Sequence, residues 1–169
     1  AGANASVTAH TQIVGNIINA NGVATLAGAY PYPVDLINNM VAAGTITAKI
    51  DIGNIIGGSY VSSGATTMVA ETEIGGVTVQ ATQGATLTTT SGDIVNTTVE
   101  GSTVGLTAGN NISNTAVEAL TAANLTAVGI LGSTVTAGSD ANLSAPLIAD
   151  TMVTTLAGNA NLTALASIS

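Results

Sequence analysis

The sequence predicts an all-β fold, a right-handed parallel β-helix (β-solenoid) of about 8–9 coils with about 18–20 residues per coil. Three observations predict it: a leucine that returns at nearly constant intervals, an Ile–Val pair between successive leucines, and a Gly, Asn or Asp at a fixed position within that pair. Repeats this short are typical of solenoids, in which a single coil cannot bury its apolar face and stacks on its neighbours.

The leucine repeat is clearest in residues 85–164, where successive leucines are 19, 19, 18 and 19 residues apart. Other aliphatic residues extend it to the N-terminus, and Ile46 and Ile50 are both candidates for its third member. The expected column is Val7, Leu26, Ile46 or Ile50, Met68, Leu87, Leu106, Leu125, Leu143 and Leu162. Around Leu125 polar and apolar residues alternate, which predicts a half-buried strand.

The Ile–Val pair consists of two apolar residues five positions apart. The pairs are Ile13–Ile18, Leu36–Val41, Ile56–Val61, Ile74–Val79, Ile94–Val99, Ile112–Val117, Ile130–Val135 and Ile148–Val153. Two residues after the first member of each pair lies a turn position, filled by Gly15, Asn38, Gly58, Gly76, Asn96, Asn114, Gly132 and Asp150. Gly, Asn and Asp adopt positive φ at the lowest cost, so this position predicts a sharp corner in every coil.

A coil of this length is too short for a strand and a crossover helix, but it accommodates two or three strands with their turns. Each strand then pairs in parallel with its copy in the next coil, about 4.8 Å away. Parallel connections of this kind are right-handed by strong preference. Inward Leu, Ile, Val and Ala form continuous columns, whose burial stabilises the stack.

We expect a single domain over residues 1–169, with an inserted loop around residues 27–35. This segment contains Tyr30, Pro31, Tyr32 and Pro33, and proline cannot donate to a strand ladder. The loop either folds onto the shaft or makes a lateral contact through these four residues, since exposed tyrosine is enriched at interfaces.

The composition excludes several classes of partner. The chain has one Lys or Arg against nine Asp and Glu, a net charge of −8, so it lacks the clustered cations that nucleic acid requires. Anionic lipid is disfavoured for the same reason, and no apolar run approaches the roughly 18 residues of a membrane span. Without cysteine there is neither a disulfide framework nor a thiolate metal site. No cofactor is expected.

The candidate chemical groups do not form a recognisable catalytic motif. His10 is the only histidine, and no Ser–Asp pair accompanies it in sequence. Glu100 and Glu118 occupy equivalent positions in neighbouring coils, as do Glu73 and Asp93. We interpret them as a solvated acidic stripe and do not expect an enzyme; a weak Ca²⁺ site and an acid–base pair for glycoside hydrolysis are the alternatives.

The outward columns are rich in Asn and Thr. Asn124, Asn142 and Asn161, each the first residue of an Asn-x-Ser/Thr sequon, fall in one column. We predict stacked side-chain amides there; glycans, which would be crowded at about 5 Å spacing, are the alternative. The outward threonines form an uncharged face, so ice binding is an alternative function, although Ala27 and Val69 interrupt the array.

Residues 85–164, most clearly LTAGNNISNTAVEALTAANLTAVG, resemble the 19-residue repeats of the filamentous-haemagglutinin type. The resemblance implies a right-handed parallel β-helical shaft of the kind found on secreted adhesins. It covers about half of the chain well and the first 80 residues loosely.

The end coils suggest self-association. Ile168 lies six residues after Leu162, and Ile13 lies six residues after Val7, so the tail of one subunit could continue into the head of another. The expected polymerisation interface comprises Ser6, Val7, Thr8, Ile13, Leu162, Ala164 and Ile168. A head-to-tail contact that does not close produces a filament.

The sequence therefore favours a structural subunit of an extracellular filament or sheath, polymerising head-to-tail through open β-helix ends. A shaft segment of a longer haemagglutinin-like adhesin and an ice-binding solenoid are the alternatives. The partners expected are the protein itself and, beyond it, cell-surface or matrix components. Because the chain starts at Ala1 without Met, we expect an extracellular or cell-surface location after signal-peptide removal.

Overall fold

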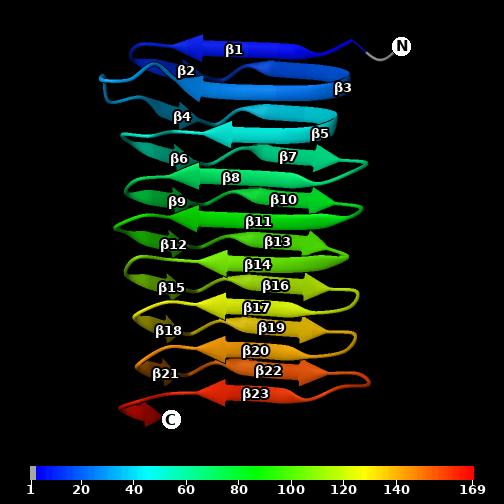
Figure 1. The fold of residues 1–169 in the computed structure, drawn as a ribbon, viewed down its shortest axis with the longest axis vertical. Coiled ribbons are helices and arrows are strands. Elements are labelled where there is room, and N and C mark those ends of the chain that lie inside the picture. The colour runs from blue at the N-terminus through cyan, green and yellow to red at the C-terminus, as the bar shows by residue number, and fades with distance from the viewer. Residues whose placement is uncertain (1–2) are drawn as a thin grey trace.

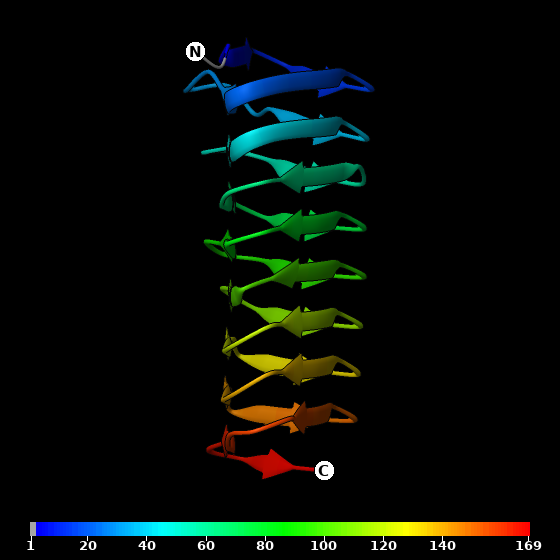
Figure 2. The ribbon, with the colours of Figure 1, turned by 90° about the vertical axis from the view of Figure 1, so that its right-hand side faces the viewer.

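The computed structural model describes residues 3–169, which form one continuous stack of parallel strands without a helix. Three strands per coil define three faces, named here after the residue that each buries: the leucine, isoleucine and valine faces. In Figure 1 the front strands run to the left and the rear strands to the right while the chain descends, which makes the coil right-handed. Seen from the side, the coils stay stacked along one axis (Figure 2). The predicted parallel β-helix is confirmed, and its nine-stranded isoleucine sheet corresponds to nine coils.

The leucine face comprises β1 (Ala5–Ala9), β3 (Ile17–Gly28), β5 (Met40–Lys49), β8 (Thr66–Ala70), β11 (Gly84–Thr89), β14 (Thr103–Thr107), β17 (Ala123–Thr126), β20 (Ala141–Ser144) and β23 (Ala160–Thr163). The isoleucine face comprises β2 (Gln12–Val14), β4 (Asp35–Ile37), β6 (Asn54–Ile56), β9 (Glu73–Gly75), β12 (Asp93–Val95), β15 (Asn111–Ser113), β18 (Gly129–Leu131), β21 (Leu147–Ala149) and β24 (Ser167–Ile168). The valine face comprises β7 (Ser59–Ser62), β10 (Thr78–Ala81), β13 (Thr98–Gly101), β16 (Ala116–Ala119), β19 (Thr134–Ala137) and β22 (Met152–Thr155), together with the first parts of β3 and β5.

The leucine column runs in register through the whole stack, with one correction. Its third member is Ala48, which pairs with Leu26 on one side and Met68 on the other. Ile46 and Ile50, the two predicted candidates, lie two residues before and two residues after Ala48, and both are buried. The prediction was wrong because it assumed a large aliphatic residue at this position. The position holds the small Ala48, and the large side chains of Ile46 and Ile50 fill the interior on either side of it. A register shift between β3 and β5 at Ala20 and Val23 also displaces this coil from the regular period.

The Ile–Val pairs are confirmed except in the third coil. There Ile55 pairs with Leu36 and Ile74, and Tyr60 pairs with Val41 and Val79, so both predicted members are displaced by one residue. Ile55 and Tyr60 are fully buried, whereas Val61 is 43% exposed. The interior therefore accepts one aromatic ring in place of a valine.

The predicted turn position has positive φ in all eight coils that contain it. The residues two positions after the inward isoleucine or leucine have φ between 49° and 63°: Gly15, Asn38, Gly57, Gly76, Asn96, Asn114, Gly132 and Asp150. Gly58, the predicted residue of the third coil, follows the turn residue Gly57 and also has positive φ, 96°. A side chain at Gly58 would collide with the backbone of Asn39, so this coil needs two glycines.

Polar side chains that follow this turn point inward and are satisfied by the backbone. The hydroxyls of Thr97, Thr115 and Ser133, all buried, donate to the carbonyl oxygens two residues earlier at 2.9–3.1 Å. In an early coil Asn39 takes this role, donating from Nδ2 to the Ile13 carbonyl oxygen at 2.8 Å. The carbonyl oxygens of Val95, Ser113 and Leu131 also accept a backbone amide of the preceding coil at 3.0–3.1 Å. The buried hydroxyl therefore finds a partner by adding a second hydrogen bond to a corner carbonyl, which has two lone pairs.

The side chain of Asn96 is exposed, so we expect this position to select asparagine for its positive φ and not for side-chain packing. Asn96→Ala should lower the free energy of unfolding by about 1 kcal/mol, since alanine tolerates this conformation poorly. Asn96→Gly should stay within about 0.5 kcal/mol of the wild type. Urea unfolding of both variants measures the difference, and equal stabilities would show that the corner imposes no such constraint.

Tyr60 is the exception among the described buried polar groups, because its hydroxyl has no hydrogen-bond partner. The nearby Asn39 side chain is engaged by Ile13 and Asn16. Burial raises the pKa of Tyr60 to about 12, an effect that the Asn39 side chain only partly opposes.

The raised pKa of Tyr60 makes stability depend on alkaline pH. The unfolded chain ionises its tyrosine near pH 10 and the folded chain near pH 12, so the free energy of unfolding should fall by about 2–3 kcal/mol across this window. Tyr60→Phe should lose this part of the pH dependence and be at least as stable at pH 7, because it removes an unsatisfied buried hydroxyl. Urea unfolding between pH 7 and 12, with Tyr32→Phe as the control, provides the measurement; identical pH profiles for the two variants would contradict it.

Candidate functional site

The C-terminal coil exposes a surface that the inner coils bury. Leu162 and Val153 are partly exposed and Ile168 is 54% exposed, whereas Leu143 and Ile148 in the preceding coil are each 1% exposed. The outer edges of the strands that carry them, β22, β23 and β24, have no partner strand among the described residues. This end therefore presents both unpaired backbone and open core.

The N-terminal coil is open in the same way on its leucine face. Val7 is partly exposed, with Ser6 and Thr8 projecting outward on either side of it. Ile13 differs, because it is only 3% exposed, so its contribution to a contact would come from the backbone of β2. Within residues 3–169, β1 and β2 have a strand on one side only.

The two groups of predicted interface residues lie at opposite ends of the rod (Figure 1). Ser6, Val7 and Thr8 are in β1 and Ile13 is in β2. Leu162 is in β23, Ile168 is in β24, and Ala164 lies between them. They can therefore meet only between two molecules.

The predicted loop lies between β3 and β4. Its six residues, 29–34, exceed the two residues that join β8 to β9. Tyr30 is 76% and Tyr32 is 55% exposed, and Pro31 and Pro33 are exposed as well. His10 of the preceding coil meets Tyr32 edge to face, with ring centroids 5.7 Å apart and an interplanar angle of 71°.

The acidic stripe is brought together as predicted. Glu100 pairs with Glu118, and Glu73 pairs with Asp93. Glu100 accepts a hydrogen bond at 3.0 Å from the Gln80 amide of the coil before it. This neutral donor offsets part of the repulsion between like charges in neighbouring strands.

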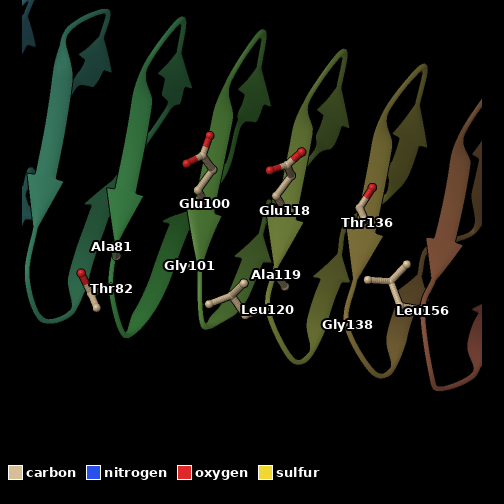
Figure 3. Close-up of a pocket in the computed structure, with 10 residues that line it drawn as sticks. All are labelled: Ala81, Thr82, Glu100, Gly101, Glu118, Ala119, Leu120, Thr136, Gly138 and Leu156. Atoms are coloured by element: carbon tan, nitrogen blue, oxygen red, sulfur yellow. The ribbon is translucent and has the colours of Figure 1, made fainter.

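An open groove of about 410 Å³ lies beside Glu100 and Glu118, at the corner that follows the valine face. The two carboxylates project side by side from neighbouring strands, and Leu120 and Leu156 extend from the turns below them (Figure 3). Both leucines are more than 75% exposed, at 78% and 77%. The groove thus has an acidic wall and an aliphatic wall. The sequence reasoning missed these leucines, since a lone leucine at a turn carries no periodic signal.

The predicted amide stack is present on the leucine face. Asn142 Nδ2 donates to Asn124 Oδ1 at 2.9 Å, and Asn161 Nδ2 donates to Asn142 Oδ1 at 2.8 Å. The chain of bonds runs in one direction and leaves Asn161 Oδ1 as an acceptor facing the C-terminal end. The ladder therefore ends in an unused hydrogen-bonding group at the open coil.

Among the described residues, no group of three or more His, Cys, Asp or Glu side chains is arranged to hold a metal ion. Nor does the described part of the chain contain a helix long and apolar enough to cross a membrane.

No family model, curated protein or solved structure is detectably similar to the chain. The likeness to filamentous-haemagglutinin repeats therefore remains a resemblance of pattern without support at the level of a family. The fold defines the class, a β-solenoid with three strands per coil.

Asn142 should contribute to stability through its two ladder bonds. Asn142→Ala removes both and should lower the free energy of unfolding by about 1 kcal/mol, because each exposed bond contributes at the low end of the usual range. Thr126→Ala, which changes an outward side chain on the same face outside the ladder, is the matched control. Urea unfolding measures both, and equal effects would show that the amide ladder is energetically neutral.

Proposed function

We propose that the protein is a structural subunit of an extracellular filament or sheath, polymerising head-to-tail by stacking its open β-helix ends. The observation that supports this most strongly is the shared geometry of the two end coils. Leu162 and Ile168 are six residues apart, as are Val7 and Ile13. One translation along the axis can therefore place both strands of one coil in register with both strands of the other.

Such a joint would extend the packing already present inside the rod. Leu162 would pack on Val7 of the next copy, as Leu143 packs on Leu162 within the chain. Ser6 occupies the outward position before Val7, equivalent to that of Asn161 before Leu162. Its hydroxyl could donate to the free Asn161 Oδ1 and so prolong the amide ladder. Strand addition at unpaired edges supplies the backbone hydrogen bonds.

The valine face would be joined differently. The chain passes from β22 on the valine face to β23 on the leucine face and β24 on the isoleucine face. In the proposed filament the next strand would be β1 of the neighbouring copy, which lies on the leucine face. One strand position on the valine face is therefore unfilled, between β22 of one copy and Ile17–Ala20 of the next. Two of the three faces would carry the contact.

Charge favours growth along the axis over bundling. A net charge of −8 with a single cationic side chain makes the sides of neighbouring rods repel. The end surfaces consist mainly of Val, Leu, Ile, Ala, Ser and Thr, so this repulsion opposes lateral association more than end-to-end contact.

Polymerisation should be blocked by a charge placed in the open core of either end. Val7→Lys and Leu162→Lys should each abolish fibres, or raise the concentration needed for them by roughly a hundredfold, because polar end coils act as caps on solenoids. Thr126→Lys, which adds the same charge to an outward position of an inner coil, should polymerise like the wild type. Electron microscopy and sedimentation across a concentration series give the readout. A wild type that stays monodisperse at high concentration would overturn the proposal.

A shaft segment of a longer haemagglutinin-like adhesin is the alternative that the same end coils allow, since further coils in one chain would cover them equally well. The size of the native gene product distinguishes the two. In a shaft, cell-surface or matrix components would be the partners, and the exposed residues 30–33 offer a lateral contact.

One observation favours ice binding as a second function, an outward threonine column in the early coils that the sequence repeat did not predict. Thr25, Thr47, Thr67 and Thr86 stack directly in one outward column of the leucine face. The neighbouring column is interrupted there by Lys49 and Val69. Thermal hysteresis of the monomer, lost in Thr67→Leu, would support this second function.

A further inference from the structure

The corner between the leucine and isoleucine faces changes character along the rod. One position per coil, three residues after the leucine column, marks this corner: His10, Ala29, Asp51, Glu71, Thr90, Gly109, Val128, Pro146 and Leu165. The last three are aliphatic or proline and exposed, with Val128 at 52% and Leu165 at 90%. We call Val128, Pro146 and Leu165 the corner ridge.

Backbone hydrogen bonds show that the corner ridge is a stack. The Ala166 amide donates to the Pro146 carbonyl oxygen at 2.9 Å, and the Leu147 amide donates to the Val128 carbonyl oxygen at 3.4 Å. The Ser167 amide also approaches the Pro146 carbonyl oxygen, at 3.4 Å. Continued two residues past Ser144 and Thr163, the register of the leucine face places Leu165 over Pro146, and the register of β18 with β21 places Pro146 over Val128. The ridge therefore ends at the C-terminal coil with the most exposed large apolar side chain described, Leu165.

The same corner at the other end of the rod holds ring side chains. The chain has four aromatic side chains, three tyrosines and one histidine, and no Phe or Trp. Three of them, His10, Tyr30 and Tyr32, lie at this corner in the first two coils, and we call them the aromatic cluster. The Ala29 amide donates to the Ala9 carbonyl oxygen at 2.8 Å, which stacks the start of the loop on His10. The contact between Tyr32 and His10 then turns the loop towards the N-terminal coil.

We propose that Leu165 of one copy packs against His10 and Tyr32 of the next copy, so that the corner ridge and the aromatic cluster form the apolar anchor of the joint. This inference rests on the proposed function. Pairing Leu162 with Val7 of the next copy carries Leu165 to His10, because each lies three residues further along its chain.

The charges of this corner support a second copy as the occupant. Asp51 and Glu71, its carboxylates, lie in the third and fourth coils, away from both ends. An aliphatic residue on one end thus meets rings on the other without a charge between them. Aromatic anchors of this kind dominate the energetics of many interfaces, and Leu165 leaves water on contact.

A pair of introduced cysteines tests the contact directly. The chain has no cysteine. Residue 10 directly follows β1 and residue 165 lies between β23 and β24, strands at opposite ends of the molecule (Figure 1), so a disulfide between these residues can form only between copies. Adjacent strands place the two Cα atoms about 4.8 Å apart, within disulfide range. Oxidised His10→Cys/Leu165→Cys protein should give a ladder of covalent oligomers on a denaturing gel. The pair His10→Cys/Leu120→Cys, with a cysteine at a leucine of an inner coil that is also largely exposed (78%), should not.

A second measurement concerns affinity. Leu165→Ala should raise the critical concentration for polymerisation by roughly tenfold, while Leu120→Ala leaves it unchanged. Tyr32→Ala should raise it as well, and the double variant Tyr32→Ala/Leu165→Ala should show less than the product of the two single effects, since both remove one contact. Leu165 is exposed in the monomer, so its replacement is not expected to affect folding, which circular dichroism checks.

The outcomes separate the two proposals. If the wild type forms no fibres, the filament and this joint both fail. If fibres form but the His10→Cys/Leu165→Cys protein gives no covalent ladder and Leu165→Ala assembles like Leu120→Ala, the joint lacks this anchor while the filament stands.

Discussion

Each coil of this rod closes on the same register because one residue, two positions after the inward isoleucine or leucine, adopts a left-handed backbone conformation. Eight such residues share φ values between 49° and 63°. Only glycine, and at modest cost asparagine or aspartate, accepts this conformation. The corner sets where the next strand starts, and so decides which side chains of the valine face point inward. In several coils a buried Thr or Ser directly after the turn then donates a second hydrogen bond to a corner carbonyl that already accepts a backbone amide.

In-register parallel stacking places residues of the same type above one another in neighbouring coils. Whether this stabilises the rod depends on the chemistry of the side chains in each column. Apolar columns gain continuous burial, and asparagine columns gain one side-chain hydrogen bond per step, as between Asn124 and Asn142. Carboxylates gain nothing from a carboxylate neighbour, which fits a composition with only 6% charged residues. Two pairs are exceptions, Glu73 with Asp93 and Glu100 with Glu118, and the Gln80 amide partly compensates the second. The same logic operates at the ends, because an end coil displays the surface that an inner coil uses to bind its neighbour.

The third coil shows how packing overrides the repeat. Ala48 takes a position that elsewhere holds Leu, Val or Met, yet Ile46 and Ile50 on either side of it fill the interior. Tyr60 takes the position of a valine, and its buried hydroxyl is left without a partner. A periodic pattern assigns each column separately, whereas the interior balances volume between columns of the same coil. This is why pattern reasoning erred here and succeeded in the regular coils that follow.

The sequence alone determined the period of the coils, the corner residues, the apolar columns and the amide stack, because each of these depends on residues close in the chain or on strict repetition. It also paired Glu100 with Glu118 and Glu73 with Asp93, since regular spacing converts directly into neighbouring strands. Only the tertiary structure decided the members of the third coil, the meeting of His10 with Tyr32 and the stacking of Leu165 beyond Pro146. These depend on the bulge in β3 and on the six-residue loop that follows it, or on which turn side chains are left uncovered at a corner. Loop length and bulges shift one strand against another without leaving a period in the sequence, so such contacts become visible only when the coils are stacked.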